Sequence, residues 1–185
     1  MLVAPKGAAT RPTSDRLRET LFNILAARAG GLEGVRFVDL YAGTGAVGIE
    51  AASRGAARVW MAENGESALK AIRANLQALG IAAEVEIEAR GSGALLERLA
   101  KQSSKIDVVF LDPPWEAEAD YARTLEFLGG ERGRAMLAED VIVIAEHSVK
   151  KKPAERYGAL VQTRELKQGD AGLSFYTLKM ASTLV

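Results

Sequence analysis

The fold is decided by residues 35–48, which read VRFVDLYAGTGAVG. The first six residues include Val and Phe and predict a short strand, and glycines follow at Gly43, Gly45 and Gly48. Glycine permits a tight turn and lets the backbone approach a ligand closely. Residues 46–53 then predict a helix that ends near Gly55. A strand, a Gly-rich turn and a helix in this order indicate an α/β sheet with a ligand site at the turn.

The same alternation continues along the chain. After a helix at about residues 14–29, capped by Thr13, the hydrophobic pattern predicts strands at 35–40, 58–63, 84–88, 106–112 and 141–146 and helices at 46–53, 67–79, 94–101 and 121–128. Residues 160–166 and 173–178 predict an antiparallel hairpin. We therefore expect an α/β fold with a doubly wound, mostly parallel seven-stranded sheet and a C-terminal antiparallel hairpin.

The composition excludes several kinds of chemistry. The 185 residues fit one domain, and they contain no Cys and one His, His147. A disulfide, a covalent cysteine adduct and a Cys-ligated cluster are therefore excluded, and a Ser-His-Asp triad or a His-based zinc site is disfavoured. The net charge of zero argues against a strongly basic nucleic-acid binder. The sequence has no long apolar run, so we expect a cytoplasmic protein. Because Cys is absent and His is single, we expect its chemistry to use carboxylates, backbone groups, aromatic rings and a cofactor, and no metal.

Two acidic residues accompany the Gly-rich turn. Asp39 stands just before it, and Glu63 ends the next predicted strand, where a carboxylate can accept both hydroxyls of a ribose. These features fit NAD as well as a nucleoside that carries methionine. Asp39 modestly favours the second, because a carboxylate at this place can bind an ammonium group.

The motif Asp112-Pro113-Pro114-Trp115 follows the predicted buried strand 106–111, which places it at the rim of the same expected cleft. Two prolines stiffen the loop and direct its carbonyl groups. The Asp112 carboxylate and a carbonyl near Pro113 can accept the two hydrogens of a base amine, so that the nitrogen lone pair faces a methyl donor. Trp115 offers a flat face to an unstacked base. The motif favours methyl transfer to a planar amine.

The same tetrapeptide resembles the [D/N/S]-P-P-[F/Y/W] motif of amino-methyltransferases. Residues 11–25, RPTSDRLRETLFNIL, are similar to the N-terminal signature of the RsmD family, the bacterial 16S ribosomal RNA guanine-N2 methyltransferases. Residues 39–51 and 53–56 resemble the cofactor loop of that family. The resemblance extends from about Arg11 to Leu178.

This resemblance implies a Rossmann-like class I methyltransferase fold, S-adenosylmethionine as methyl donor and a guanine N2 amine of 16S ribosomal RNA as acceptor, free or within the small subunit. It implies that Asp112 and Pro113 hold the amine and that Trp115 stacks on the guanine. Cofactor contacts are expected from Asp39, Ala42, Gly43, Gly45, Glu63, Ser92 and Asp112.

The resemblance also implies a division of the chain. Residues 1–34 are expected to cover the cofactor cleft and contact RNA, and residues 35–185 to form the methyltransferase domain. We expect a monomer without a membrane partner. The chain departs from the family pattern in two places. The departure at Asn64-Gly65 concerns the ribose side of the cofactor site. The departure at residues 89–93 concerns the adenine, whose recognition is expected to rest on backbone groups or Ser92.

Two basic zones suit a phosphate backbone, and solvated surface charge explains them equally well. The RNA contacts expected from them are Arg11, Arg16, Arg18, Lys150 and Lys151. Three other functions are open. A DNA adenine-N6 or cytosine-N4 methyltransferase uses the same tetrapeptide, but we expect 185 residues to leave no room for a separate target-recognition domain. An NAD-dependent oxidoreductase leaves Asp112–Trp115 unexplained, and a non-catalytic RNA-binding module leaves the cofactor turn unexplained.

Overall fold

The computed structural model describes residues 15–28 and 30–179 of the chain. Thr13, the predicted cap of the first helix, and Arg11 lie outside these residues. The chain forms two compact units, of which the first ends at Leu95 and the second begins at Leu96.

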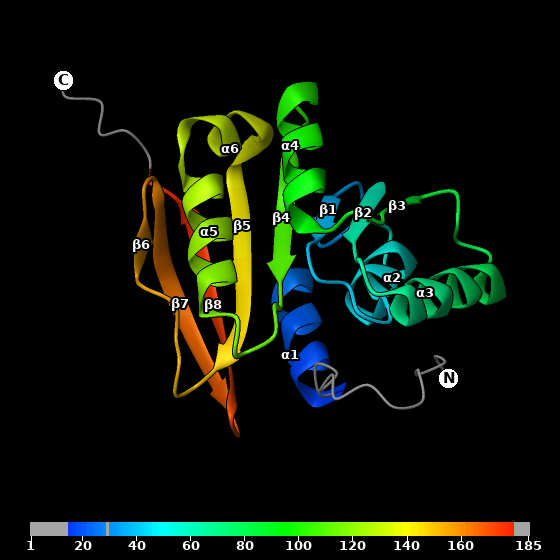
Figure 1. The fold of residues 1–185 in the computed structure, drawn as a ribbon, viewed down its shortest axis with the longest axis horizontal. Coiled ribbons are helices and arrows are strands. Elements are labelled where there is room, and N and C mark those ends of the chain that lie inside the picture. The colour runs from blue at the N-terminus through cyan, green and yellow to red at the C-terminus, as the bar shows by residue number, and fades with distance from the viewer. Residues whose placement is uncertain (1–14, 29, 180–185) are drawn as a thin grey trace. The chain divides into compact units, whose positions relative to one another are not determined.

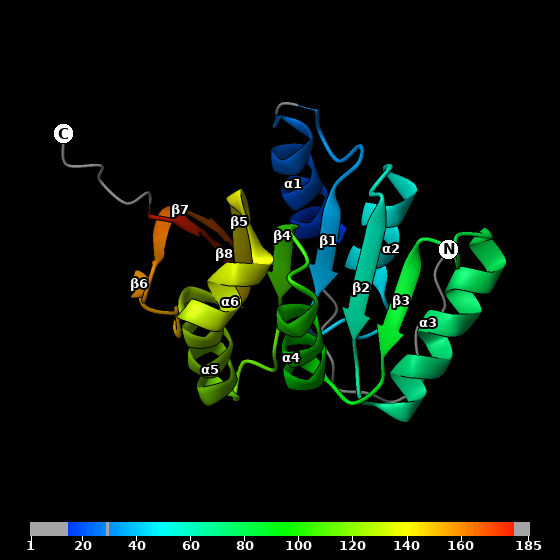
Figure 2. The same ribbon diagram turned by 90° about the horizontal axis from the view of Figure 1, so that it is seen from above.

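The first unit is built on a parallel three-stranded sheet. Its strands lie in the order β3-β2-β1, side by side in Figure 2. The elements are α1 (Asp15–Ala26), β1 (Arg36–Asp39), α2 (Ala46–Ser53), β2 (Arg58–Ala62), α3 (Glu66–Leu79) and β3 (Val85–Glu88), followed by the start of α4 (Ser92–Gln102). Strand and helix alternate, as the sequence predicts for a parallel sheet.

Hydrophobic burial explains why these segments adopt their structures. Three of the four residues of β1 and four of the five residues of β2 are buried, which is typical of parallel strands covered on both faces. Helix α2 packs against both strands. Helix α3 buries one face through Leu69, Ile72 and Leu76 and ends at Gly80, which adopts the left-handed conformation common at helix ends.

The second unit holds a five-stranded mixed sheet in the order β4-β5-β8-β7-β6. Strands β4 and β5 are parallel, and the other neighbouring pairs are antiparallel. Helix α5 contacts β6 and β7 on one face of this sheet (Figure 1). The elements are β4 (Ile106–Leu111), α5 (Glu118–Gly129), α6 (Glu131–Met136), β5 (Leu137–Ser148), β6 (Arg156–Tyr157), β7 (Leu160–Gln168) and β8 (Ala171–Leu178).

The C-terminal end of α5 packs directly on the backbone around β6. A Cβ atom at Gly129 would overlap the Tyr157 carbonyl oxygen, far inside van der Waals contact. The Ala159 N–H donates a hydrogen bond to the Gly129 carbonyl at 3.0 Å. Glycine is required at position 129 because backbone meets backbone there.

The single histidine belongs to the core of the second unit. His147 is fully buried, and its Nε2 lies 2.8 Å from Ser174 Oγ while its Nδ1 lies 2.9 Å from the Ser148 carbonyl oxygen. Nδ1 therefore donates to the carbonyl, and Nε2 accepts from the hydroxyl. Burial lowers the pKa of His147, so the neutral ring is favoured. This residue supports the pairing of β5 with β8.

Most predicted helices and strands are confirmed, but several begin or end at other residues than predicted. The described residues contain eight strands where seven were predicted, because β6 has only two residues and leaves no periodic pattern. Helix α6 was not predicted. Helix α1 ends earlier than predicted, at Ala26, and α4 begins earlier than predicted, at Ser92. In the part of the chain that the structure describes, no helix has the length and apolar character needed to cross a membrane.

Candidate active site

The turn after β1 adopts the conformation that its glycines permit. Gly43 and Gly45 have φ angles of +54° and +82°, a region that other residues rarely adopt. The Gly45 N–H donates to the Ala42 carbonyl at 2.7 Å and closes the turn, and α2 begins at the next residue. From α3, the buried Asn75 donates a hydrogen bond through Nδ2 to the Thr44 carbonyl at 3.3 Å. A Cβ at Gly43 would meet no atom within 4 Å, so this side of the turn is open.

Asp39 lies at the end of β1 with 1% of its surface exposed. Its Oδ2 accepts a hydrogen bond from the Gly48 N–H at 3.0 Å, while its Oδ1 has no partner in good hydrogen-bond geometry among the described residues. Burial raises the pKa of Asp39 to about 7, against the opposing effect of the Gly48 and Tyr41 backbone N–H groups. A buried carboxyl group that has one oxygen without a well-placed hydrogen-bond donor and a pKa near 7 is suited to binding a cationic ligand.

Glu63 joins the end of β2 to the glycine turn. Its Oε2 accepts a hydrogen bond from the Gly43 N–H at 2.9 Å, and its Oε1 accepts from Asn64 at 2.8 Å and Gly65 at 2.6 Å. Asn64 and Gly65, the next two residues of the chain, thus orient this carboxylate through their backbone N–H groups. A carboxylate oxygen has more than one acceptor site, so Glu63 retains capacity for ligand hydroxyl groups.

A third acidic residue ends β3 and was not predicted as a site residue. Glu88 is 8% exposed and accepts hydrogen bonds from the Arg90 guanidinium at 2.8 and 3.0 Å and from the Arg90 N–H at 3.1 Å. Ser92, the predicted adenine contact, is the first residue of α4 just beyond it. Asp39, Glu63 and Glu88 each stand at the carboxyl end of a strand of one sheet, and this repeated position is the signal by which Glu88 could have been found.

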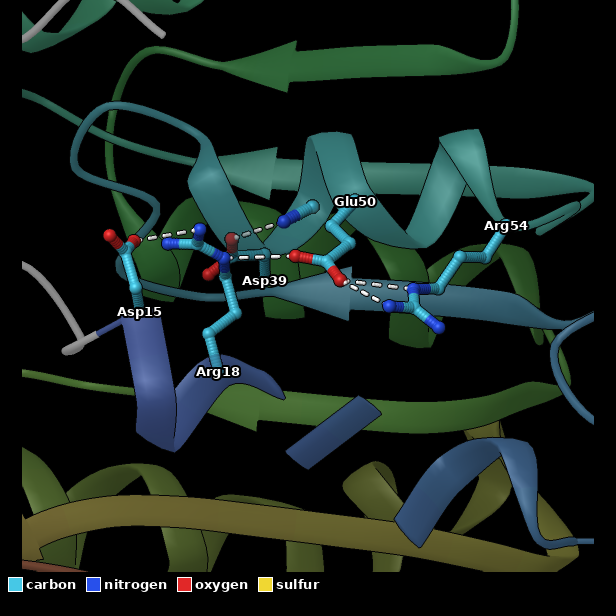
Figure 3. A network of polar contacts seen from close by, with 6 residues as sticks. Asp15, Arg18, Asp39, Glu50 and Arg54 are labelled. Atoms are coloured by element: carbon cyan, nitrogen blue, oxygen red, sulfur yellow. Dashed lines mark hydrogen bonds and ion pairs between the residues drawn. The ribbon is translucent and has the colours of Figure 1, made fainter. Parts of the chain in front are cut away.

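A network of ion pairs joins α1 to α2 (Figure 3). Arg18 of α1 donates hydrogen bonds to Glu50 of α2 at 2.9 Å and to Asp15 at 2.9 Å, and Arg54 binds Glu50 at 2.7 Å. Only 20% of the Arg18 side chain is exposed. The two predicted RNA contacts in α1 therefore differ in their availability to RNA. Arg18 forms ion pairs within the protein, whereas Arg16 is exposed to solvent.

In the second unit, the Asp112–Trp115 motif begins directly after β4. All β4 residues except Asp107 are buried, which anchors the loop. Pro113 is buried, and Asp112 and Trp115 are half-buried. The Ala117 N–H donates to the Pro114 carbonyl at 2.8 Å, and the Tyr121 hydroxyl lies 3.1 Å from the Pro113 carbonyl oxygen. Tyr121 was predicted only as the start of a helix.

The two predicted lysine contacts follow β5 in the same unit. Lys150 and Lys151 are exposed, and Lys151 Nζ lies 2.8 Å from a carboxylate oxygen of Glu118, the first residue of α5. An exposed ion pair of this kind contributes little to stability, and both lysine side chains face solvent.

Comparisons with known proteins identify relatives of this chain. The family model described as Conserved hypothetical protein 95 matches residues 1–177. "Putative rRNA methyltransferase YlbH" of Bacillus subtilis (strain 168) is 32% identical over 175 residues, which cover 95% of this chain and 91% of that protein. "Ribosomal RNA small subunit methyltransferase D" of Escherichia coli (strain K12) is 32% identical over 150 residues, which cover 80% of this chain and 69% of that protein.

Solved structures confirm the Rossmann-like α/β fold. "Putative methyltransferase yhhF from Escherichia coli" matches with a TM-score of 0.78 at 29% identity, covering 96% of this chain and 91% of that one. A hypothetical protein of Thermus thermophilus has a TM-score of 0.78 at 23% identity, covers 96% of this chain and 93% of that one, and supports the fold alone. The chain therefore belongs to the Conserved hypothetical protein 95 family, and its resemblance to the RsmD family is confirmed.

Proposed function

We propose that this chain is an S-adenosylmethionine-dependent methyltransferase that modifies the exocyclic N2 amine of a guanine in 16S ribosomal RNA. The observation that supports it most is the Asp112–Trp115 loop, which follows a buried strand and has both of its proline carbonyls bound by neighbouring donors. The names of the relatives, which describe ribosomal RNA methyltransferases, support RNA as the substrate class.

The residues of the first unit fit S-adenosylmethionine. Asp39 offers a buried carboxyl oxygen without a well-placed donor among the described residues, Gly43 leaves open space, and Glu63 is fixed at the end of the adjacent strand. Asp39 would bind the ammonium group, Glu63 the ribose hydroxyls, and Ala42, Gly43, Gly45 and Ser92 would line the remainder. When bound, the cofactor supplies an electrophilic methyl group on a sulfonium ion.

The motif residues would prepare the amine. An exocyclic base nitrogen is a weak nucleophile because its lone pair is delocalised into the ring. Hydrogen bonds from its two hydrogens to the Asp112 carboxylate and the Pro113 carbonyl would favour a pyramidal nitrogen, whose lone pair is then available. Trp115 would hold the base by stacking, and the surplus proton would leave the nitrogen after transfer.

Nucleoside mass analysis tests the proposal. The chain is incubated with methyl-labelled S-adenosylmethionine and, in separate reactions, with unmethylated small subunits, naked 16S RNA and DNA. We expect labelled N2-methylguanosine from one or both RNA reactions. N6-methyladenine or N4-methylcytosine in the DNA reaction would contradict the proposal and support the DNA methyltransferase alternative.

Cofactor binding is expected to depend on pH through Asp39. Its pKa of about 7 means that the carboxylate form becomes scarce as the pH falls below that value. Because only this form attracts the ammonium group, calorimetric affinity for S-adenosylmethionine should fall by up to about tenfold between pH 7.5 and pH 6. Asp39→Asn should bind weakly at both pH values and show little of this dependence.

The same shift has an opposite effect on stability. Because the pKa of Asp39 is raised above its ordinary value of 3.8, the folded chain holds the proton more tightly than the unfolded chain. The contribution of Asp39 to stability is therefore greatest below about pH 4 and is lost as the pH rises to about 7. Asp39→Asn should raise the thermal midpoint at pH 7.5. An unchanged midpoint and an unchanged pH dependence of binding would together contradict the role of Asp39.

Arg16 and Arg18 should respond differently to replacement by Gln. Arg16 is exposed, so Arg16→Gln should weaken RNA binding and reduce its salt dependence by about one counterion. Arg18 binds Asp15 and Glu50, so Arg18→Gln should lower stability by about 1 kcal/mol with a smaller effect on RNA. Filter binding at several salt concentrations and urea unfolding measure both effects. Equal losses of RNA affinity would argue against this distinction.

A further inference from the structure

The Pro113 carbonyl is held by a side chain from outside its loop. Pro113 and Pro114 have no backbone N–H, so the loop has few donors of its own to orient its peptide groups. The Tyr121 hydroxyl donates a hydrogen bond to the Pro113 carbonyl at 3.1 Å. Tyr121 lies in α5 and is 5% exposed, so water has little access to this contact.

The same hydroxyl also binds the neighbouring strand. Tyr121 Oη lies 2.9 Å from the Glu146 carbonyl oxygen, near the carboxyl end of β5. A phenol has one proton, which two carbonyl oxygens share here. The ring thus connects the loop after β4 to β5. A carbonyl oxygen has two lone pairs, so the Pro113 oxygen can still accept a second hydrogen bond while Tyr121 occupies the first.

From this arrangement we infer that Tyr121 is a positioning residue, which sets the direction of the Pro113 carbonyl for the substrate amine. The inference rests on the proposed function. When the amine donates to the second lone pair of the Pro113 oxygen, the Tyr121 hydroxyl stays bound to the first and to the Glu146 carbonyl, so the carbonyl keeps its direction while the substrate is bound. Without the hydroxyl, the Pro113 carbonyl loses this fixed direction, and small displacements of a positioning group reduce turnover strongly.

Tyr121→Phe tests the inference, and the chain provides a matched control. Tyr176 is also buried in the second unit, and its hydroxyl donates to the Ala154 carbonyl at 2.9 Å, away from the Asp112–Trp115 motif in sequence. Each substitution removes one buried phenol hydroxyl and keeps the ring. Tyr121→Phe should lower kcat for RNA methylation by about tenfold to a hundredfold, with S-adenosylmethionine affinity within about twofold of wild type. Tyr176→Phe should keep kcat within about twofold.

A second measurement is independent of activity. The chain has five prolines, so carbonyl-¹³C proline labelling gives few resonances, and the Pro113 resonance is identified by its loss in Pro113→Ala. Tyr121→Phe should shift this resonance, and Tyr176→Phe should leave it in place. 3-Fluorotyrosine at position 121, which keeps the hydroxyl, should restore most of kcat.

The outcomes separate this inference from the proposed function. An unmoved Pro113 resonance, unchanged kcat in Tyr121→Phe, or an equal loss of kcat in Tyr176→Phe would each overturn the positioning role while leaving RNA methylation intact. Failure of the wild-type chain to methylate any RNA overturns the proposed function, and the positioning role with it. The carbonyl shift in Tyr121→Phe then still reports whether the hydrogen bond exists.

Discussion

Asp112→Ala is expected to lower kcat for RNA methylation by about 10²- to 10³-fold, the usual effect of removing one group that stabilises a transition state. The substitution removes the carboxylate that would accept one hydrogen of the amine, whereas the proposed contacts of Asp39 and Glu63 with the cofactor persist. Calorimetric affinity for S-adenosylmethionine should therefore change by less than about threefold. Single-turnover methylation with saturating RNA measures the loss of kcat.

Two further substitutions define the origin of this effect. Asp112→Asn keeps one carbonyl acceptor, so its kcat should lie between those of wild type and Asp112→Ala. Asp120, eight residues later, forms an exposed ion pair with Arg123, and Asp120→Ala should leave kcat unchanged. Wild-type turnover in Asp112→Ala would show that the carboxylate does not hold the amine.

Gly129→Ala is expected to destabilise the chain by about 3 kcal/mol, at the upper end of the usual cost of overpacking. The added methyl group would overlap the Tyr157 carbonyl oxygen, and its neighbours are backbone atoms that cannot rotate away. Either α5 or β6 must move, and the hydrogen bond from Ala159 to the Gly129 carbonyl is strained with it. Urea unfolding of purified protein measures the change in free energy.

Gly93→Ala provides the control for this prediction. Gly93 lies in α4, and a Cβ there would meet no atom within 4 Å. Since alanine is the better helix former, Gly93→Ala should stabilise the chain by up to about 1 kcal/mol. A Gly129→Ala variant as stable as wild type would mean that α5 and β6 are not in direct backbone contact.

The alternation of elements could be predicted from the sequence because each segment buries a regular apolar pattern. Strand β4 is apolar in five of its six residues, and its prediction was confirmed. Strand β6 could not be predicted in this way, because two residues show no alternation and Arg156 is exposed. Its position depends on pairing with β7 and on contact with α5, both of which are tertiary.

The candidate site, too, could be predicted only in part from the sequence. Asp39, Glu63 and Asp112 could be proposed from their positions after predicted strands. Tyr121 could not, because an isolated tyrosine in a helix has no spacing that reveals its partner, the Pro113 carbonyl eight residues earlier. Nor does the sequence distinguish Arg18, which pairs with a glutamate 32 residues away, from the exposed Arg16.

The buried carboxyl group of Asp39 has a consequence for the heat of cofactor binding. With a pKa of about 7, roughly half of the molecules hold a proton there at pH 7. Capture of a positively charged ligand favours the carboxylate form, so about half a proton per site passes to the buffer. The apparent binding enthalpy should therefore differ between phosphate and Tris, whose protonation heats are unequal, and this difference counts the protons released.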